Sequence, residues 1–317
     1  MERIIVADGI TLNPGDLDWG PLEQFGEVEI FDRTPSNLRE ERFKQASIIV
    51  VNKVIVDSDL MNQLPNLRCI CVSATGVNNV DLKHAKGRGI SVFNVVGYGS
   101  AAVAQHVFAT ILAFTNKIYE HNQSVQNGQW NVAPDFCYTL SPIIELQGKT
   151  LGIYGFGKIG KAVAQIALAF GMKVIANHKH PERDKTEGVQ FVSLEELLEA
   201  SDFVTLHAPL TDSNQQIVNA HLLGKMKSNA ILINTGRGGL INEVDLKTAL
   251  EEEWIAGAGL DVLSQEPPRE GNNLMGVKNC IITPHNAWAS RASRQRLLDA
   301  TIENISAFLN GKAGNCA

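Results

Sequence analysis

The sequence has 317 residues, of which 44% are hydrophobic and 20% are charged, and its net charge is -6. This length suits two domains, each able to bury a core of its own, better than one domain. The acidic excess argues against a general affinity for nucleic acid or an anionic membrane, so any small anion must be bound by a local site.

The cysteines favour a reducing compartment. They are odd in number, scattered, and contain no C-x-x-C pair, which argues against a disulfide framework or a metal site: Cys69, Cys71, Cys137, Cys280 and Cys316. The first residues, MERIIVADGI, lack the basic segment and apolar core of a signal peptide. The most apolar helical pattern, 101–114, carries Gln105 and His106 and falls short of a membrane span. We therefore expect a cytoplasmic protein.

Residues 1 to about 96 alternate strand patterns with helical ones. The expected strands are 4–7, 28–31, 48–51, 69–72 and 91–94, and the helical patterns between them are 22–25, 38–46, 60–64 and 81–86. Repeated alternation of this kind predicts a parallel sheet with helices on both faces.

A long helix is expected over 100–126, followed by a segment rich in Pro, Asn and aromatic residues. Such a segment between two α/β blocks is typical of a crossover and an arm, here about 120–148. Its aromatic residues Trp130, Phe136 and Tyr138 would suit a partner subunit, or would equally cover their own domain.

The second block begins at Thr150 and alternates again. After the strand that starts there, its expected strands are 173–177, 189–192, 203–207, 230–234, 256–261 and 281–283. A helix over 292–309 should return to the first domain. The prediction is one domain formed by 1–98 and 291–317, and a second formed by 99–290.

The stretch TLGIYGFGKIG, 150–160, predicts a dinucleotide site. An apolar strand pattern enters a turn with Gly155, Gly157 and Gly160, and a helical pattern follows. Glycine at the first two positions lets main-chain N–H groups and the helix N-terminus approach a pyrophosphate, and the third lets helix and strand pack closely. The intervening Phe156, Lys158 and Ile159 belong to the same site. The alternative is an ordinary turn between strand and helix.

Polar residues follow the other expected strands of this block, where open parallel sheets bind ligands: His178, His207, Thr235 with Arg237, Asp261 and His285. Arg237, flanked by glycines in INTGRGG, could offer its guanidinium to a carboxylate, or could be a structural arginine. His285 follows Pro284, and Glu266 lies in DVLSQEPP. Together the three provide an anion clamp, a proton carrier near neutral pH and a carboxylate that favours the protonated histidine.

The chain resembles the D-isomer-specific 2-hydroxyacid dehydrogenase family, and within it the glycerate dehydrogenase (hydroxypyruvate reductase) branch. The resemblance runs nearly end to end through VSATGVNNVD, NVVGYGSAAVAQH, LQGKTLGIYGFGKIGKAVA, LHAPLT, INTGRGGLINE, AGAGLDVLSQEPP and ITPHNAWAS. It implies a flavodoxin-like substrate domain and a Rossmann cofactor domain with a cleft between them, and a homodimer joined through the cofactor domains. It also implies His285 as acid and base, Glu266 as its orienting partner and Arg237 as substrate clamp.

The same resemblance implies further binding residues. The loop Ser73, Ala74, Thr75, Gly76 would hold the substrate carboxylate through main-chain N–H groups, although Gly76 alone could be a turn glycine. Asp261 would contact the nicotinamide carboxamide, Trp288 would border the substrate pocket, and Asn286 departs from an expected apolar residue. The matched motifs add Ala208, Pro209 and Gly236 to the cofactor site, and Lys53 to the substrate site.

The cofactor is predicted from the end of strand 173–177. An NAD enzyme usually has an acidic residue about twenty positions after the glycine turn, whereas this chain has His178, followed by Lys179, His180 and Arg183. This cluster could attract a 2′-phosphate, although Glu182 and Asp184 dilute it, and an NAD enzyme could tolerate a solvated basic loop. We expect NADP or NAD, with NADPH used at least as well as NADH.

The substrate is expected to be a small unphosphorylated 2-oxo acid. The loop VVNKVIV offers Lys53 rather than an arginine cluster, and no regulatory extension is expected after residue 317, which together argue against phosphoglycerate. Hydroxypyruvate/D-glycerate and glyoxylate/glycolate fit best. The alternative is a corepressor-like sensor that resembles the same family and binds NAD(P)H without significant turnover.

Overall fold

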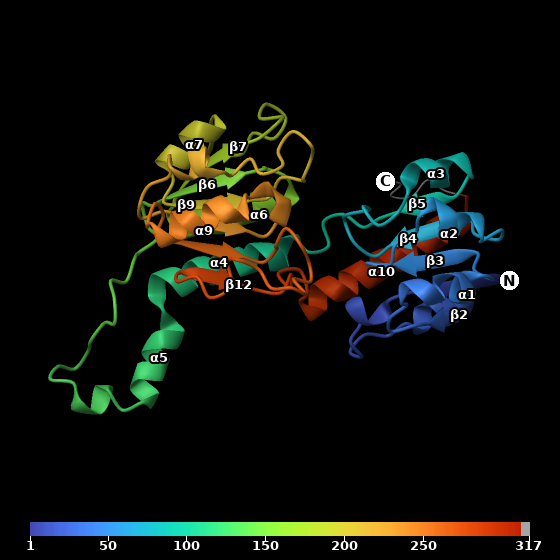
Figure 1. The fold of residues 1–317 in the computed structure, drawn as a ribbon, viewed down its shortest axis with the longest axis horizontal. Helices are drawn as coiled ribbons and strands as arrows, with labels where there is room; N and C mark the ends of the chain where they lie inside the picture. The colour runs from blue at the N-terminus through green and yellow to red at the C-terminus, as the bar shows by residue number, and fades with distance from the viewer. Residues whose placement is uncertain (312–317) are drawn as a thin grey trace. The chain divides into compact units, whose positions relative to one another are not determined.

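A computed structural model describes residues 1–311; residues 312–317, which include Cys316 and the end of the predicted first domain, lie outside the described part. The chain forms two compact units. Unit 1 consists of Met1–Gly99 and the segment from Trp288 onward, and unit 2 of Ser100–Ala287 (Figure 1). Both are parallel sheets covered by helices, the α/β fold expected from the alternation in the sequence.

Unit 1 contains a five-stranded parallel sheet of order β2-β1-β3-β4-β5, which is the flavodoxin-like order. Its strands are β1 (Glu2–Val6), β2 (Gly26–Ile30), β3 (Ile48–Val51), β4 (Cys69–Val72) and β5 (Ser91–Phe93). Its helices are η1 (Gly9–Thr11), η2 (Gly20–Phe25), η3 (Ser36–Leu38), α1 (Arg39–Phe43), α2 (Ser58–Asn62), α3 (Leu82–Gly87) and α10 (Arg291–Leu309).

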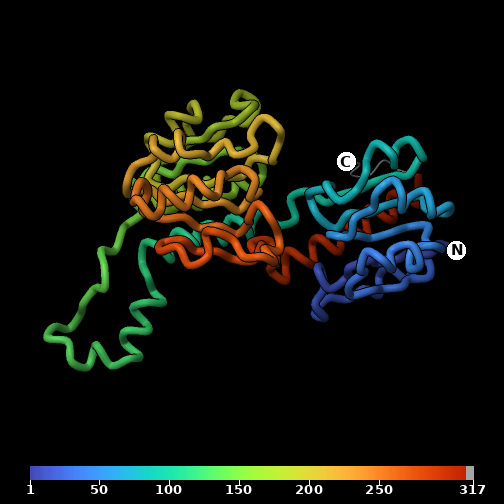
Figure 2. Tube along the Cα trace, viewed as in Figure 1, coloured from blue at the N-terminus to red at the C-terminus, as the bar shows by residue number. Residues whose placement is uncertain are grey.

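Alternate residues of these strands build two cores, because neighbouring side chains of a strand point to opposite faces. Ile4 and Val50 pack with Ile305 of α10 on one face, whereas Ile5 and Ile49 pack on the other with side chains from α1 and α2. The C-terminal helix therefore belongs to the sheet that the N-terminal strands form, and Figure 2 traces this return of the chain.

Unit 2 contains a seven-stranded parallel sheet of order β12-β11-β10-β9-β6-β7-β8. Its strands are β6 (Thr150–Tyr154), β7 (Lys173–Asn177), β8 (Val189–Phe191), β9 (Phe203–Leu206), β10 (Ile231–Asn234), β11 (Gly257–Leu260) and β12 (Cys280–Ile282). Its helices are α4 (Ser100–Asn116), α5 (Ile118–Gln126), η4 (Trp130–Val132), α6 (Lys158–Ala169), α7 (Leu194–Ala200), α8 (Ala220–Leu223), η5 (Gly238–Leu240) and α9 (Glu243–Glu251). This is the Rossmann order with one more strand.

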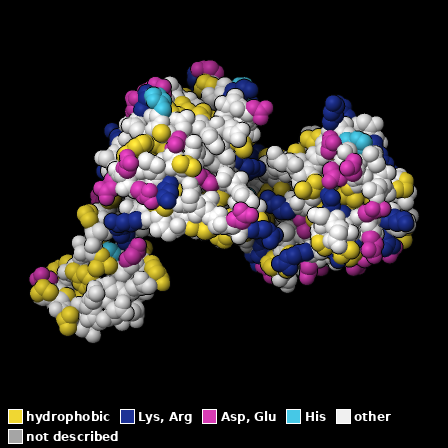
Figure 3. Space-filling model, in the orientation of Figure 1, with side chains coloured by type: hydrophobic (Ala, Val, Ile, Leu, Met, Phe, Trp, Pro, Cys, Tyr) yellow, Lys and Arg dark blue, Asp and Glu magenta, His cyan; other side chains and the backbone are white. Residues whose placement is uncertain are grey.

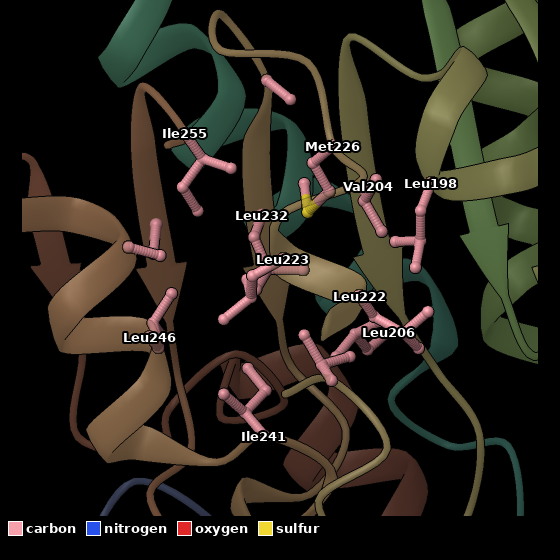
Figure 4. Close-up of a cluster of buried hydrophobic side chains, with 14 of the residues drawn as sticks. Leu198, Val204, Leu206, Leu222, Leu223, Met226, Leu232, Ile241, Leu246 and Ile255 are labelled. Atoms are coloured by element: carbon pink, nitrogen blue, oxygen red, sulfur yellow. The ribbon is translucent and has the colours of Figure 1, made fainter. Parts of the chain in front are cut away.

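The central strands of unit 2 are buried on both faces. Val204 and Leu232 pack against α7, α8 and α9 in the cluster of Figure 4, whereas Phe203, Ile231 and Ile233 face α4 and α6. This burial explains the continuous apolar runs of the sequence, which are typical of parallel strands. It also fixes the carboxyl ends of these strands, where the polar residues lie.

The predicted helix over 100–126 is wrong in one respect. The structure has two helices, α4 and α5, separated by Lys117 in a left-handed conformation with φ 48°. No glycine or proline marks this break in the sequence, so the helical pattern concealed it.

An arm formed by α5 and the segment up to residue 148 stands apart from the rest of unit 2 (Figure 2). Large apolar side chains are exposed on it, among them Ile118 (71%), Tyr119 (69%), Val132 (83%) and Phe136 (88%). Figure 3 shows hydrophobic side chains, in yellow, at the surface of the arm. Among the described residues, no helix is both long and apolar enough to span a membrane.

Candidate active site

The order of the unit 2 sheet reverses between β6 and β9, which are neighbours although β7 and β8 separate them in the sequence. The chain after β6 and the chain after β9 therefore leave the sheet side by side. Open parallel sheets bind their ligands at such a point, outside the carboxyl ends of the strands.

The glycine turn, residues 155–160, follows β6 and so lies where the order of the sheet reverses. Gly155 has φ +97°, and a Cβ there would lie 2.4 Å from the main-chain nitrogen of Ala208. A Cβ at Gly160 would lie 2.4 Å from the carbonyl oxygen of Gly155, so both glycines allow close backbone packing. A Cβ at Gly157, the residue that precedes α6, would meet no protein atom within 4 Å.

These glycines fit a dinucleotide. The first N–H groups of a helix have no partner within it, and they favour an anion. Because Gly157 carries no side chain, a pyrophosphate could approach the N–H groups of Lys158 and Ile159 at the start of α6.

His207 follows β9 and lies between two threonines. Its Nε2 is 2.9 Å from Oγ1 of Thr205 and its Nδ1 is 3.4 Å from Oγ1 of Thr235. Desolvation lowers the pKa of His207 to about 3, so the ring is neutral at pH 7. The adjoining Ala208 packs on Gly155, and the carbonyl of Pro209 accepts a hydrogen bond from Asn214.

His178, after β7, is held on both ring nitrogens. The N–H of Phe156 in the glycine turn donates to Nδ1 at 3.3 Å, and Nε2 lies 2.9 Å from Oδ2 of Asp184. Asp184 also accepts from Lys161 at 2.6 Å and from Arg183 at 2.6 Å. The Lys161, Arg183 and His178 donors hold the pKa of Asp184 well below its usual range. A carboxylate therefore lies beside the predicted basic cluster, while the side chains of Lys179 and His180 are exposed.

Arg237 follows β10 in a turn fixed by buried Asn234, whose amide accepts from the N–H of Gly236 and donates to the carbonyl of Arg237. One guanidinium nitrogen, Nη1, donates to the carbonyl of Gly236 at 2.8 Å. A guanidinium has five N–H donors, so this bond leaves capacity for an anion. A Cβ at Gly238 would lie 1.9 Å from the carbonyl carbon of Leu263, so this glycine lets the turn pack on the loop that carries Glu266.

Glu266 and His285 are in direct contact. Oε1 of Glu266 accepts the main-chain N–H of Leu263 at 2.9 Å, and Oε2 lies 2.6 Å from Nδ1 of His285. Both side chains are about one third exposed, at 32% and 31%. The carboxylate fixes the proton on Nδ1, so Nε2 is the nitrogen that can exchange a proton with another molecule.

Asp261, after β11, holds the loop that carries His285. Its buried carboxylate accepts the main-chain N–H groups of Asn286 and Ala287, both at 2.9 Å. Its main-chain carbonyl accepts the N–H of His285 at 2.8 Å. The observed contacts of Asp261 are thus with the loop, and its predicted contact with a carboxamide stays a prediction.

In unit 1, the loop of Lys53 is fixed by an aspartate. The buried carboxylate of Asp8 accepts the main-chain N–H groups of Asn52, Lys53 and Val54 at 2.8, 2.6 and 3.1 Å. The side chain of Lys53 is exposed. Asp8 therefore sets the backbone of this loop and leaves the Lys53 ammonium group in solvent.

The loop after β4 is also tied to its neighbours within unit 1. The hydroxyl of Thr75 donates to the carbonyl of Val95 at 2.9 Å, and the carbonyl of Ala74 accepts the N–H of Val95. Trp288 packs edge-on against Tyr98, with ring centroids 5.9 Å apart. Within residues 1–311, no group of three or more His, Cys, Asp or Glu is placed to hold a metal ion.

A protein-family model matches most of unit 2. Residues 108–287 match the family model described as D-isomer specific 2-hydroxyacid dehydrogenase, NAD binding domain. The chain belongs to the D-isomer specific 2-hydroxyacid dehydrogenase family. It is therefore an oxidoreductase that transfers a hydride between a nicotinamide cofactor and a small 2-oxo or 2-hydroxy acid, as the resemblance in the sequence implied.

Several relatives align with nearly the whole chain. The chain is 45% identical to a hydroxypyruvate reductase of Blautia hydrogenotrophica, over 99% of this chain and 98% of that protein. It is 44% identical to a glycerate dehydrogenase of Methylorubrum extorquens, with the same coverage. An acyclic imino acid reductase (Bsp5) solved with NADPH and D-Arg superposes with a TM-score of 0.86 at 31% identity, over 99% of both chains. These comparisons give the sensor alternative no support.

Sequence patterns missed the roles of several polar residues that hold these loops. Asp8 acts through a loop distant in the sequence, and Asn234 acts through its own turn. For Asp184 the sequence indicated only its charge, and its contacts with Lys161 and His178 were not predicted. The sequence offered one signal, the position of Asn234 at the end of an apolar run, because an amide buried there needs hydrogen-bond partners.

Proposed function

We propose that this enzyme reduces small unphosphorylated 2-oxo acids, with hydroxypyruvate first and glyoxylate second, to the corresponding D-2-hydroxy acids. The observation that carries the proposal is the His285–Glu266 pair, which lies on the same unit as the glycine turn and follows strands of the same sheet. The near-complete alignment with a hydroxypyruvate reductase and a glycerate dehydrogenase supports this choice of substrate.

In this mechanism His285 moves the proton. The nicotinamide, when bound, supplies a hydride to the carbonyl carbon of the 2-oxo acid. His285 donates the proton on Nε2 to the carbonyl oxygen during reduction, and takes the hydroxyl proton during oxidation. Glu266 accepts a hydrogen bond from Nδ1–H throughout, which orients the ring and places a negative charge beside it.

Arg237 binds the substrate in this proposal. A planar guanidinium matches the geometry of a carboxylate, and its charge also polarises a neighbouring carbonyl oxygen. Main-chain N–H groups of the loop Ala74, Thr75, Gly76 are proposed to bind the same carboxylate, with Lys53 and Trp288 bordering the substrate.

We propose that NADPH is used at least as well as NADH. No acidic residue stands at the end of β7, and the exposed Lys179 and His180 could approach a 2′-phosphate. Both nitrogens of His178 are engaged, so its proposed part is to hold the turn through Phe156 rather than to bind the phosphate. Asp184 offsets part of the positive charge, which argues against an exclusive preference.

The arm is proposed to join two copies of the chain. Its exposed apolar side chains would be buried against a second copy, as at other homodimer interfaces. Light scattering tests this: Val132→Ser with Phe136→Ser should give a monomer, whereas a dimer of unchanged stability would exclude the arm. The cytoplasmic location stays a prediction.

A panel of 2-oxo acids tested with NADH and NADPH decides the substrate proposal. Hydroxypyruvate should give the highest kcat/KM. A protein that binds NADPH but turns over none of the panel would instead behave as a sensor.

A further inference from the structure

Helix α4 packs on strand β11 at two glycines of the strand. A Cβ at Gly259 would lie 2.2 Å from Cγ2 of Thr110, and a Cβ at Gly257 would lie 2.7 Å from Cε1 of Phe114. The two glycines of β11 therefore let side chains of α4 rest directly on the strand. A larger residue at either position would push the helix away.

The contacts have a regular register. Four residues along a helix advance about 6 Å, and two residues along a strand advance about 6.6 Å. The spacing from Phe114 to Thr110 on the helix is therefore close to the spacing from Gly257 to Gly259 on the strand. The next residue on the helix at this spacing is His106, four positions before Thr110. The next residue on the strand side is Asp261, two positions after Gly259. The structure has this contact: Nε2 of His106 lies 3.8 Å from Oδ1 of Asp261.

Thr283 lies between the two. Nε2 of His106 is 3.1 Å from Oγ1 of Thr283, and that hydroxyl donates to Oδ1 of Asp261 at 2.6 Å. A hydroxyl rotates freely unless its partners fix it. A proton on Nε2 of His106 would be donated to the Thr283 oxygen, and the Thr283 proton is then directed at Asp261.

Asp261 in turn holds the loop of His285. His285 has φ +52°, a conformation that residues other than glycine adopt rarely. Asp261 accepts three main-chain N–H groups here: its carbonyl accepts that of His285, and its carboxylate accepts those of Asn286 and Ala287. The buried carboxylate therefore sets the backbone from which the imidazole of His285 reaches Glu266.

We propose that His106 and Thr283 are positioning residues for His285, acting through Asp261. This inference rests on the proposed role of His285 as the proton carrier. His106 fixes the Thr283 hydroxyl, the hydroxyl fixes the Asp261 carboxylate, and the carboxylate holds the N–H groups of Asn286 and Ala287, the two residues that follow His285. A small displacement of a catalytic group can cost a large factor in rate, which makes the network important although it does not touch the substrate.

The test compares His106→Ala and Thr283→Val with the conservative His106→Gln and Thr283→Ser, which keep a donor and a hydroxyl. The first pair should lower kcat with hydroxypyruvate roughly tenfold to a hundredfold while KM and the NADPH Kd, measured by fluorescence, change little. The conservative pair should recover most of the rate. His221→Ala, an exposed histidine of α8, is the matched control.

The double variant His106→Ala with Thr283→Val should lose little more than either single variant, because both act through one network. Equal kcat in wild-type protein, His106→Ala and Thr283→Val would overturn the inference, and so would a loss that the conservative variants fail to recover. If His285→Ala retained its rate, the proposed function itself would fail, which is a separate outcome. Thermal unfolding of each variant shows whether it is folded, and His106→Gln with Thr283→Ser keeps the test valid if a larger change unfolds the chain.

Discussion

Nδ1 of His285 lies 2.6 Å from Oε2 of Glu266, and the other oxygen of that carboxylate accepts the main-chain N–H of Leu263. The loop of Glu266 thus holds the carboxylate independently of its contact with the imidazole. A histidine held in this way keeps one nitrogen for proton exchange and presents it in one orientation.

Replacing Glu266 with Gln should lower kcat for hydroxypyruvate by roughly tenfold to a hundredfold, because a neutral amide stabilises the charged imidazole less than a carboxylate does. Steady-state kinetics measure this. Glu270→Gln, an exposed carboxylate four residues further along the chain, is the control and should behave like the wild type. Wild-type kcat in the Glu266 variant would remove this residue from the mechanism.

Asp184→Asn should raise the preference for NADPH over NADH. The change removes the negative charge that Lys161 and Arg183 now neutralise, so both cations become available to a 2′-phosphate. The ratio of kcat/KM for NADPH to that for NADH should rise roughly tenfold. Glu182→Gln, which alters only an exposed pair with Lys185, should leave the ratio as it is. An unchanged ratio in the Asp184 variant would place the phosphate elsewhere.

Two glycine variants separate folding from cofactor binding. Gly157→Ala should unfold at the wild-type temperature, because its Cβ clashes with nothing in the protein. It should bind NADPH roughly tenfold more weakly, because it adds a side chain next to the first N–H groups of α6, where a pyrophosphate is proposed to bind. Gly155→Ala should be destabilised by more than about 2 kcal/mol, because it combines a positive φ with a backbone clash at Ala208. Unimpaired binding by folded Gly157→Ala would argue against the pyrophosphate position.

Asp16 should contribute stability that depends on pH. Its carboxylate accepts from both terminal nitrogens of buried Arg294 at 2.6 and 2.7 Å, and these hydrogen bonds hold the pKa of Asp16 below its ordinary value. A depressed folded pKa gives stability that is present above the unfolded pKa of about 3.9 and is lost as the pH falls through the folded pKa. The melting temperatures of wild-type protein and Asp16→Asn should therefore differ most near about pH 7 and converge as the pH falls through the folded pKa. A constant difference over that range would show that the charge of Asp16 is not the cause.

Most strands could be predicted because parallel strands buried on both faces are short apolar runs bounded by polar residues. The runs at 48–51, 69–72 and 173–177 have the same bounds in the structure. The break at Lys117 could not be predicted, because a lysine in a left-handed conformation has no sequence signature comparable to that of glycine.

The residues of the site also divide into those that the sequence could predict and those that it could not. Arg237, Glu266 and His285 could be proposed from strand ends and flanking glycines, since the sheet brings those ends to one edge. The contact of His106 with Thr283 joins residues 177 positions apart and depends on the packing of α4 against β11. Local patterns carry no information on that packing, so such residues emerge only from the folded chain.

The most direct test of the central claim is the rate of NADPH oxidation with hydroxypyruvate, for the wild type and for His285→Ala, with NADPH binding measured for both. The wild type should turn over, and the variant should bind NADPH normally yet lose a factor on the order of 10² to 10⁴ in kcat. A variant as fast as the wild type, or a wild type that binds NADPH and consumes none, would contradict the account.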